Sequence, residues 1–263
     1  VVLRTQTLRL EKGWNAVWLE VEPEAASLEA LFEGRPVDIV AAFTLPVSEA
    51  QFAKSTAVNL QTLGGWTVWF VPHRADAKLS RLGRLSGNRG YLMHALEPVT
   101  LEIRGDVRLA PVRWTPDSYN LVGFSVETPG GPPFKQFFQG SPAHNHNKIY
   151  RLSGGAWRQL LAPEAETMRA GEAFWIFCDG PSDYPGPLQV SSSALLGVHL
   201  TETGTCHLSF LNRTGHPLAF TLEHVPGGNS EVPMSGLIAV LKDNVIGQAG
   251  QALGGIGRKD RVH

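Results

Sequence analysis

Two histidines separated by one residue, His144 and His146, have the spacing in this chain that best fits metal ligation. Residues i and i+2 of an extended segment share a face, so both imidazoles could reach one ion. A metal site needs further ligands, and no other ligand-type side chain adjoins the pair. The alternative is a solvated loop with two ordinary histidines. We therefore expect no bound metal and no other cofactor.

The two cysteines of the chain, Cys178 and Cys206, allow two readings. In an exported protein they could form one disulfide that ties two domains together, or they could be small buried hydrophobes in separate strands. A catalytic Cys–His pair is disfavoured at Cys206, because strand alternation places it and the adjacent His207 on opposite faces.

Motifs that carry common catalytic chemistry do not occur in the sequence. It contains no G-x-S-x-G nucleophile turn, no H-E-x-x-H zinc helix and no dinucleotide-binding fingerprint. The glycines between Gly83 and Gly90 have the wrong spacing for a phosphate cradle. Carboxylates are plentiful, but no two of them are marked out as a pair. We therefore expect no catalytic residues and a protein that is not an enzyme.

Tryptophan is abundant, with seven residues, and aromatic faces suit sugar rings. Trp66 and Trp157 lie at matching points of a repeated pattern described below, so we expect them in a shared core. Trp18, Trp69 and Trp114 have no clear repeat. We expect these three to be exposed, either at a protein interface or in a sugar-binding site.

The repeated pattern indicates how these side chains are positioned. Residues 13–22 (GWNAVWLEVE) recur as residues 118–127 (SYNLVGFSVE), and each copy is followed by an apolar stretch ending in glycine. The shared residues, Asn15 and Asn120 among them, are expected to be scaffold, with each amide bonded to local backbone groups. A ligand-binding role for the repeated amide is the alternative. A specific site should lie where the copies differ.

Frequent turns and alternating apolar residues indicate that most elements are strands. Gly and Pro number 28 and 18, and charged residues are 18% of the chain, below the roughly 25% of an average soluble domain. A short helix is expected at 48–60, in a segment without a counterpart in the second copy. The expected strands are 8–10, 14–21, 66–71, 91–95, 99–103, 120–126, 148–152, 157–160, 173–177, 187–190, 206–211 and 218–222.

The predicted fold class is mainly β, with two tandem duplicated sandwich-like or barrel-like modules, short helices and an immunoglobulin-like β section. The first module is expected at residues 1–106 and the second at 107–190. The β section at 191–230 is shorter than the roughly 100 residues of a whole immunoglobulin-type sandwich. The glycine-rich tail at 231–263 is expected to be mobile, or ordered only against a partner.

Charge and hydropathy exclude two classes of partner. The net charge is −1, and the sequence has no block of Lys and Arg that could hold a nucleic-acid backbone. No apolar run approaches the roughly 20 residues of a membrane-spanning helix. We expect neither nucleic-acid binding nor a membrane span.

The two copies resemble a module of secreted bacterial surface proteins, with the approximate pattern G-W-N-L-I-S … G-x-G-Y-W-V … L-x-V-x-G. Such modules are β-rich, non-catalytic parts of large exported proteins and often stand beside immunoglobulin-like domains. The first copy departs at Leu92, where the pattern favours an aromatic residue, and the second lacks the glycine before Tyr119. The resemblance implies an extracellular or cell-surface location. The matching segments are 13–17, 89–92 and 101–105, then 119–122, 171–176 and 188–190.

These observations predict a non-catalytic structural protein that self-assembles as the subunit of a surface layer or filament. Unpaired strand edges and the tail would make the contacts, with further copies of the chain or with other surface proteins. The alternative is a carbohydrate-binding or adhesion module that binds polysaccharide through Trp18, Trp69 and Trp114.

Overall fold

A computed structural model of the chain describes most of residues 3–218. The helix expected at 48–60, the strand at 218–222, Cys206 and nearly all of the tail lie outside the described residues. The described part is mainly β with short helices, as predicted. The described ranges are 3–25, 27–43, 65–107, 111–126, 130–145, 148–192 and 208–218, with the two short strands β14 (Leu237–Ile238) and β15 (Ala252–Leu253).

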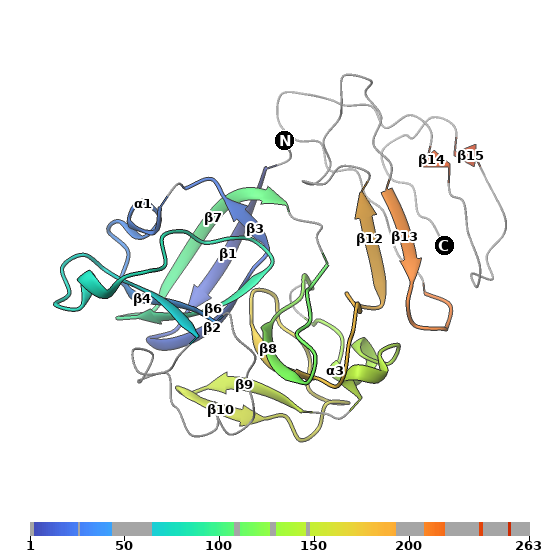
Figure 1. The fold of residues 1–263 in the computed structure, drawn as a ribbon. Helices are drawn as coiled ribbons and strands as arrows, with labels where there is room; N and C mark the ends of the chain where they lie inside the picture. Colours follow the sequence, from blue (N-terminus) through green and yellow to red (C-terminus); the bar gives the residue numbers. More distant parts are fainter. Residues whose placement is uncertain are drawn as a thin grey trace.

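Three antiparallel sheets form the body of the protein (Figure 1). The N-terminal sheet has the order β1-β7-β3, the first four-stranded sheet β2-β6-β4-β5, and the second four-stranded sheet β8-β11-β9-β10. Two further strands, β12 and β13, pair with each other. The strands are β1 (Leu3–Leu10), β2 (Gly13–Leu19), β3 (Val21–Pro23), β4 (Val37–Phe43), β5 (Trp66–Phe70), β6 (Arg89–Ala95), β7 (Val99–Val107), β8 (Ser118–Val122), β9 (Ile149–Ser153), β10 (Ala156–Gln159), β11 (Phe174–Cys178), β12 (Leu188–Ser192) and β13 (Leu208–Asn212).

The helical elements are short and cover the outer faces of the sheets. None of the described helices is long and apolar enough to cross a membrane. The helix α1 begins at Leu28, where the Ser27 hydroxyl accepts a hydrogen bond from the Ala30 amide, as an N-cap does. The helical elements are α1 (Leu28–Phe32), η2 (Ala77–Leu79), α3 (Phe134–Phe137) and η3 (Pro142–His144).

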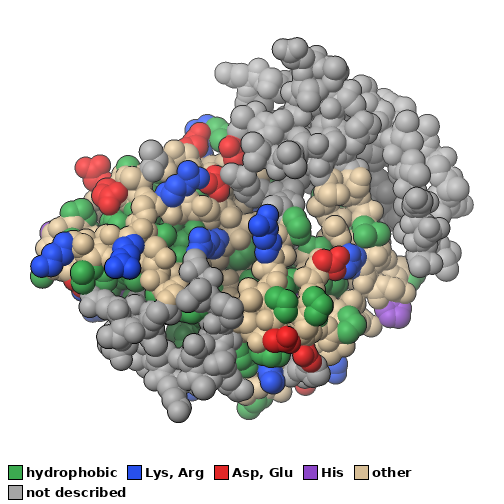
Figure 2. Space-filling model, in the orientation of Figure 1, with side chains coloured by type: hydrophobic (Ala, Val, Ile, Leu, Met, Phe, Trp, Pro, Cys, Tyr) green, Lys and Arg blue, Asp and Glu red, His purple; other side chains and the backbone are tan. Residues whose placement is uncertain are grey.

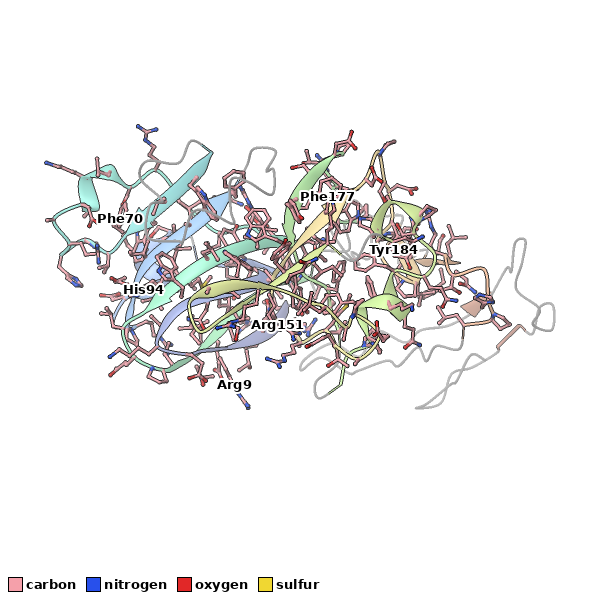
Figure 3. All side chains as sticks on the ribbon, turned by 90° about the horizontal axis from the view of Figure 1, so that it is seen from below. Arg9, Phe70, His94, Arg151, Phe177 and Tyr184 are labelled. Carbon is pink, nitrogen blue, oxygen red and sulfur yellow. The ribbon has the colours of Figure 1, made fainter. Side chains whose placement is uncertain are left out.

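The sheets stack in layers. One face of the first four-stranded sheet packs on the N-terminal sheet and α1. Its other face packs on the second four-stranded sheet, where the rings of Trp66 and Trp175 are 6.4 Å apart. The far face of the second sheet is covered by α3, η3 and Tyr184. We call residues 3–107 the first module and residues 111–184 the second module. Figure 3 shows Phe70 and His94 in the first module, Phe177 and Tyr184 in the second, and Arg151 near the boundary.

The two four-stranded sheets share their strand order and also their register. The path from one strand to the next can be followed from Asn15 in the first sheet and from Asn120 in the second. Both paths end on a tryptophan, Trp66 or Trp157, so residues matched in the sequence hold equivalent positions. The paired residues are Asn15–Met93, Leu92–Ala41 and Phe43–Trp66 in the first sheet, and Asn120–Ile176, Trp175–Tyr150 and Leu152–Trp157 in the second.

The repeated asparagine is structural, as predicted. The Asn15 amide accepts a hydrogen bond from the Glu11 backbone N–H and donates to the carbonyls of Glu11 and Gly13. Asn120 makes the same three bonds, with Thr115 and Ser118. Each amide therefore satisfies backbone groups of the turn that leads into its strand, because those groups have no ladder partner there.

Two contacts between the modules are equivalent to each other, with the residue of one module replaced by its equivalent in the other. The Ala173 N–H donates to the Ala16 carbonyl at 3.0 Å, and Gly90, the equivalent of Ala173, lies against the carbonyl of Leu121, the equivalent of Ala16. Such reciprocity is the mark of an isologous, two-fold-related interface. On its axis lies a pair of mutually equivalent residues, Trp18 and Gly123.

Trp18 has the largest side chain and Gly123 has none, and this difference in size allows the contact. The Trp18 ring enters the apolar cluster of the second module and is 2% exposed. A Cβ atom on Gly123 would lie 2.4 Å from the Trp18 Cβ and 2.5 Å from the Glu172 carbonyl oxygen. A side chain at both positions would force the modules apart.

One expectation about strand organisation needs correction. The apolar run expected as one strand at 14–21 divides at Glu20, since β2 pairs with β6 whereas β3 pairs with β7 in the N-terminal sheet. The expected end of the second module, residue 190, falls inside β12, which pairs with β13 across that boundary.

Replacing Gly123 with alanine should destabilise the protein by about 1–3 kcal/mol, because the added methyl group overpacks the contact with Trp18. The matched control is Gly83→Ala, where a Cβ meets no atom within 4 Å and φ is not positive. The control should change the free energy of unfolding by less than about 1 kcal/mol. Urea denaturation measures both, and equal midpoints for the two variants would refute the close approach.

Candidate functional site

The three tryptophans expected at the surface are buried, so that expectation is wrong. Trp18, Trp69 and Trp114 are 2%, 1% and 8% exposed. The Trp69 indole N–H donates to the Glu29 carboxylate at 2.8 Å, and the Trp114 indole N–H to the Tyr184 carbonyl at 2.7 Å. They do not repeat because each fills a layer contact peculiar to its own module. Their burial leaves none of them exposed at the surface.

His144 is also unavailable as a metal ligand. Its ring is buried, its Nδ1 lies 2.6 Å from the Ser141 hydroxyl, and its centroid is 4.1 Å from the Trp114 ring. Burial lowers the pKa of His144 to about 4, so the imidazole is neutral at pH 7. Its expected companion, His146, lies outside the described residues. Within the described ranges, no three His, Cys, Asp or Glu side chains are grouped to hold a metal ion.

Cys178 is a free, buried cysteine in β11. Its thiol donates to the Gly180 carbonyl at 3.3 Å, and burial raises its pKa to about 11. A thiol that stays protonated at neutral pH is a poor nucleophile. Cys178 forms no disulfide within the described residues. Cys206, the partner considered for such a disulfide, lies outside them.

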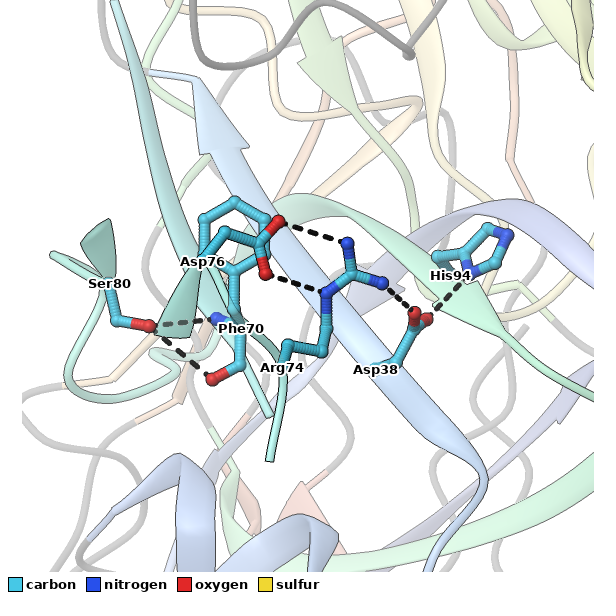
Figure 4. A network of polar contacts seen from close by, with 6 residues as sticks. All are labelled: Asp38, Phe70, Arg74, Asp76, Ser80 and His94. Carbon is cyan, nitrogen blue, oxygen red and sulfur yellow. Dashed lines mark hydrogen bonds and ion pairs between the residues drawn. The ribbon is translucent and has the colours of Figure 1, made fainter. Parts of the chain in front are cut away.

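A buried carboxylate, Asp38, organises the largest polar network of the first module (Figure 4). One oxygen lies 2.5 Å from the His94 Nδ1, and the other accepts from Arg74 at 2.6 Å. Arg74 also binds Asp76, and these hydrogen bonds raise the pKa of Arg74 and lower the pKa of Asp76. A β-bulge at Asp38 turns this side chain out of the regular alternation.

This network belongs to one module alone. His94 packs edge-on against Trp14 at 5.0 Å, and the equivalent pair in the second module is Phe177 and Tyr119 at 5.1 Å. Only the first module replaces the aromatic ring by an imidazole and adds the bulged carboxylate. Since Asp38 uses both oxygens on its own neighbours, the network ties the segment after β5 to the sheet.

A pocket of about 330 Å³ lies between the modules, on one side of the Trp18–Gly123 contact. We call it the inter-module pocket. The turn 87–90 forms one wall and the segment 111–115 another, with β8 and Trp175 beneath. The described residues that line it are Trp18, Phe43, Gly87, Asn88, Arg89, Gly90, Pro111, Val112, Arg113, Thr115, Tyr119, Asn120, Leu121, Val122 and Trp175.

The lining of this pocket is polar and aromatic. It holds two guanidinium groups, Arg89 and Arg113, beside amides, a hydroxyl and aromatic side chains. Among the described lining residues there is no carboxylate, imidazole or thiol that could transfer a proton near neutral pH. Asn88, in the turn that lines the pocket, adopts a positive φ of 56°. A few polar groups over an aromatic floor are typical of a small-molecule site.

Sequence reasoning did not identify these arginines. Arg89 lies in the matching segment 89–92 and Arg113 lies before strand β8, but neither is among the site residues that the sequence predicts. One signal was present in the repeat, because Arg89 occupies the position that Glu172 has in the second copy. A reversal of charge between equivalent residues marks a place where the copies differ.

Comparison with known proteins gave no match to any family model, curated protein or solved structure. The fold and the pocket are therefore the basis for assigning a function. Figure 2 shows one face of the molecule, on which acidic and basic side chains are interspersed without a large area of either sign.

The free energy of unfolding should fall as the pH is lowered from about 6.5 to about 4, by about 3 kcal/mol from His144 alone. The folded-state pKa of His144 is below its unfolded value, so the unfolded chain takes up the proton first. The difference in stability between the wild type and His144→Phe should therefore change with pH. For the control Val40→Ala, a buried residue in the apolar cluster of the first module, the difference should stay constant, because this change leaves the surroundings of His144 intact. Denaturation at several pH values distinguishes the two patterns.

Proposed function

We propose that this chain is a non-catalytic binding protein, and that its ligand, a carbohydrate, occupies the inter-module pocket. The observation that carries the proposal is the lining itself, with two guanidinium groups, amides and aromatic residues but no proton-transfer group among the described residues. Such a set can orient a polar ligand by hydrogen bonds without altering its bonds.

The position of the pocket supports the same proposal. It lies between two modules that are packed layer on layer, and strand β8 and Trp175 of strand β11 line it from the second four-stranded sheet. Asn120 on β8 is held by three hydrogen bonds to backbone groups. A site whose walls are fixed before the ligand arrives loses little conformational entropy on binding.

The wider setting is also a proposal. We infer that the two modules are copies of one ancestral unit, supported by their shared strand order, register and asparagine turn. The resemblance of both copies to modules of secreted bacterial surface proteins supports an extracellular or cell-surface location. In that setting, a carbohydrate ligand would make the chain an adhesion module.

Filling the pocket should abolish carbohydrate binding. Thr115 is exposed and its hydrogen bonds to Asn120 use only backbone atoms, so Thr115→Trp can block the mouth without breaking the turn. The matched control is Thr7→Trp, on the exposed side of β1. In affinity electrophoresis against acidic and neutral polysaccharides, at least one should retard the wild type and the control but not Thr115→Trp. If none retards the wild type, the proposed function is wrong.

Self-assembly is the second candidate, and β12 and β13 favour it. Within the described residues these strands pair only with each other, and two-stranded sheets are marginal by themselves. The ion pair of Arg213 with Asp183 at 2.6 Å fixes the end of β13 to the second module. Leu211 on β13 is 45% exposed, and it would be covered if another copy added a strand.

Self-assembly predicts that the mass measured by light scattering rises with protein concentration. Leu211→Lys should shift the rise to concentrations at least about tenfold higher, because a charge would be buried in the contact. Leu161→Lys is the control, since Leu161 is 85% exposed and lies outside both strands. A constant monomer mass over the whole concentration range would exclude this candidate.

A further inference from the structure

The inter-module pocket lies on only one side of the pseudo-two-fold axis. On the opposite side, Val17 and Glu172 form a bridge, the Trp18 N–H donates to the Gly171 carbonyl, and Leu8 packs on Gly171. These contacts close the space that would be equivalent to the pocket. The interface between the modules is therefore closed on the side of Gly171 and open on the side of the pocket.

The charge of the two sides is opposite. On the closed side Glu172 pairs with Arg151 at 3.0 Å, while burial raises the pKa of the Glu172 carboxyl. On the open side the equivalent residue is Arg89, which lines the pocket. Arg113 adds a second positive charge there.

Arg89 lacks the kind of partner that other buried arginines have. The described arginines that are at least partly buried are Arg74, Arg89, Arg151 and Arg213. Arg74, Arg151 and Arg213 each pair with a carboxylate at 3.0 Å or less. Among the described residues, Arg89 contacts the Phe43 carbonyl at 3.5 Å and the Tyr91 ring at 5.9 Å, and neither of these carries a carboxylate. A guanidinium that is partly desolvated without a counter-ion favours binding of an anion.

We propose that the inter-module pocket binds a carboxylate-bearing sugar of monosaccharide size, such as a uronic acid residue; this inference rests on the proposed function. Arg89 binds the carboxylate through paired N–H donors, and Arg113 neutralises it from the exposed side. The exposed Thr115 hydroxyl reaches a ring hydroxyl. The pocket volume of about 330 Å³ lies at the small end for ligand sites and suits one sugar ring.

The test is titration calorimetry of the full chain with glucuronate, glucose and sulfate at one fixed ionic strength. Glucuronate should bind at least about tenfold more tightly than glucose, because only glucuronate supplies the counter-ion for Arg89. Sulfate should bind at least about tenfold more weakly than glucuronate, since it lacks the ring. Equal affinities for glucuronate and either other probe would overturn the proposal.

The variants are Arg89→Gln and Arg113→Gln, with Arg158→Gln as the matched control. Arg158 is exposed on β10 and does not line the pocket. Arg89→Gln should weaken glucuronate binding at least about tenfold and leave glucose binding unchanged. Arg113→Gln changes an exposed residue, and it should weaken glucuronate binding severalfold. If both variants bind glucuronate as Arg158→Gln does, the arginines do not hold the carboxylate.

The outcome also separates this inference from the function on which it rests. Suppose that a neutral polysaccharide retards the wild type, that Thr115→Trp abolishes this retardation, and that glucuronate binds no better than glucose. The pocket then binds carbohydrate, but it does not select an acidic sugar. If neither polysaccharides nor glucuronate bind, both proposals fail.

Discussion

The contact of Trp18 with Gly123 is the constraint on which the arrangement of the modules depends. Two equivalent positions meet on a pseudo-two-fold axis, and only one of them can carry a side chain. Trp18 crosses from the first module into the apolar cluster of the second, where its burial stabilises the pair by the apolar area removed from water. Gly123 has no side chain and therefore leaves room for Trp18. A symmetric pair at this point would either clash or leave a cavity.

The same contact explains why the interface opens on one side. Once one ring occupies the axis, the two flanking regions are no longer interchangeable. One flank has the backbone bonds of Ala173 and Trp18 and is closed by Leu8. On the other flank the turn with Arg89 faces the segment that contains Arg113, and the space remains as the pocket. The two flanks differ in charge as well as in packing. The open flank has Arg89, whereas the closed flank has Glu172 at the equivalent position.

Local sequence signals predicted the strands well where alternation and turn chemistry agree. The strands expected at 148–152 and 157–160 are present as β9 and β10, which pair around Gly154 and Gly155, both of positive φ. The asparagine turns were predictable for the same reason, since their hydrogen bonds are local. The break at Glu20 was not, because alternation continues through it. There the Gln6 side chain binds the Glu20 N–H and the Trp18 carbonyl, so that the strand can leave one sheet for another.

The candidate site was less predictable, since exposure depends on contacts between layers. Trp69 lacks a repeat because it packs on α1, with the Phe32 ring at 5.4 Å, and not because it faces a ligand. The repeat predicts that function belongs where the copies differ, and the proposed pocket lies at such a place. It could not show that Arg89 and Arg113, which are distant in sequence, line one pocket. That proximity follows from the packing of the two modules.

Two polar groupings are peculiar to this arrangement, and their electrostatics assign them different roles. Asp38 is buried, and both of its oxygens are bound by Arg74 and His94, so its charge is compensated within the first module. Adding a ligand there would have to displace an existing bond, and removing either partner would leave a charge uncompensated. Arg89 is partly buried, with no carboxylate among the described residues to compensate it. A charge with a bound counter-ion stabilises the fold. A charge that is partly desolvated without a counter-ion favours binding of a ligand of opposite charge. The polarity of the pocket is for that reason better evidence of binding than the larger network around Asp38.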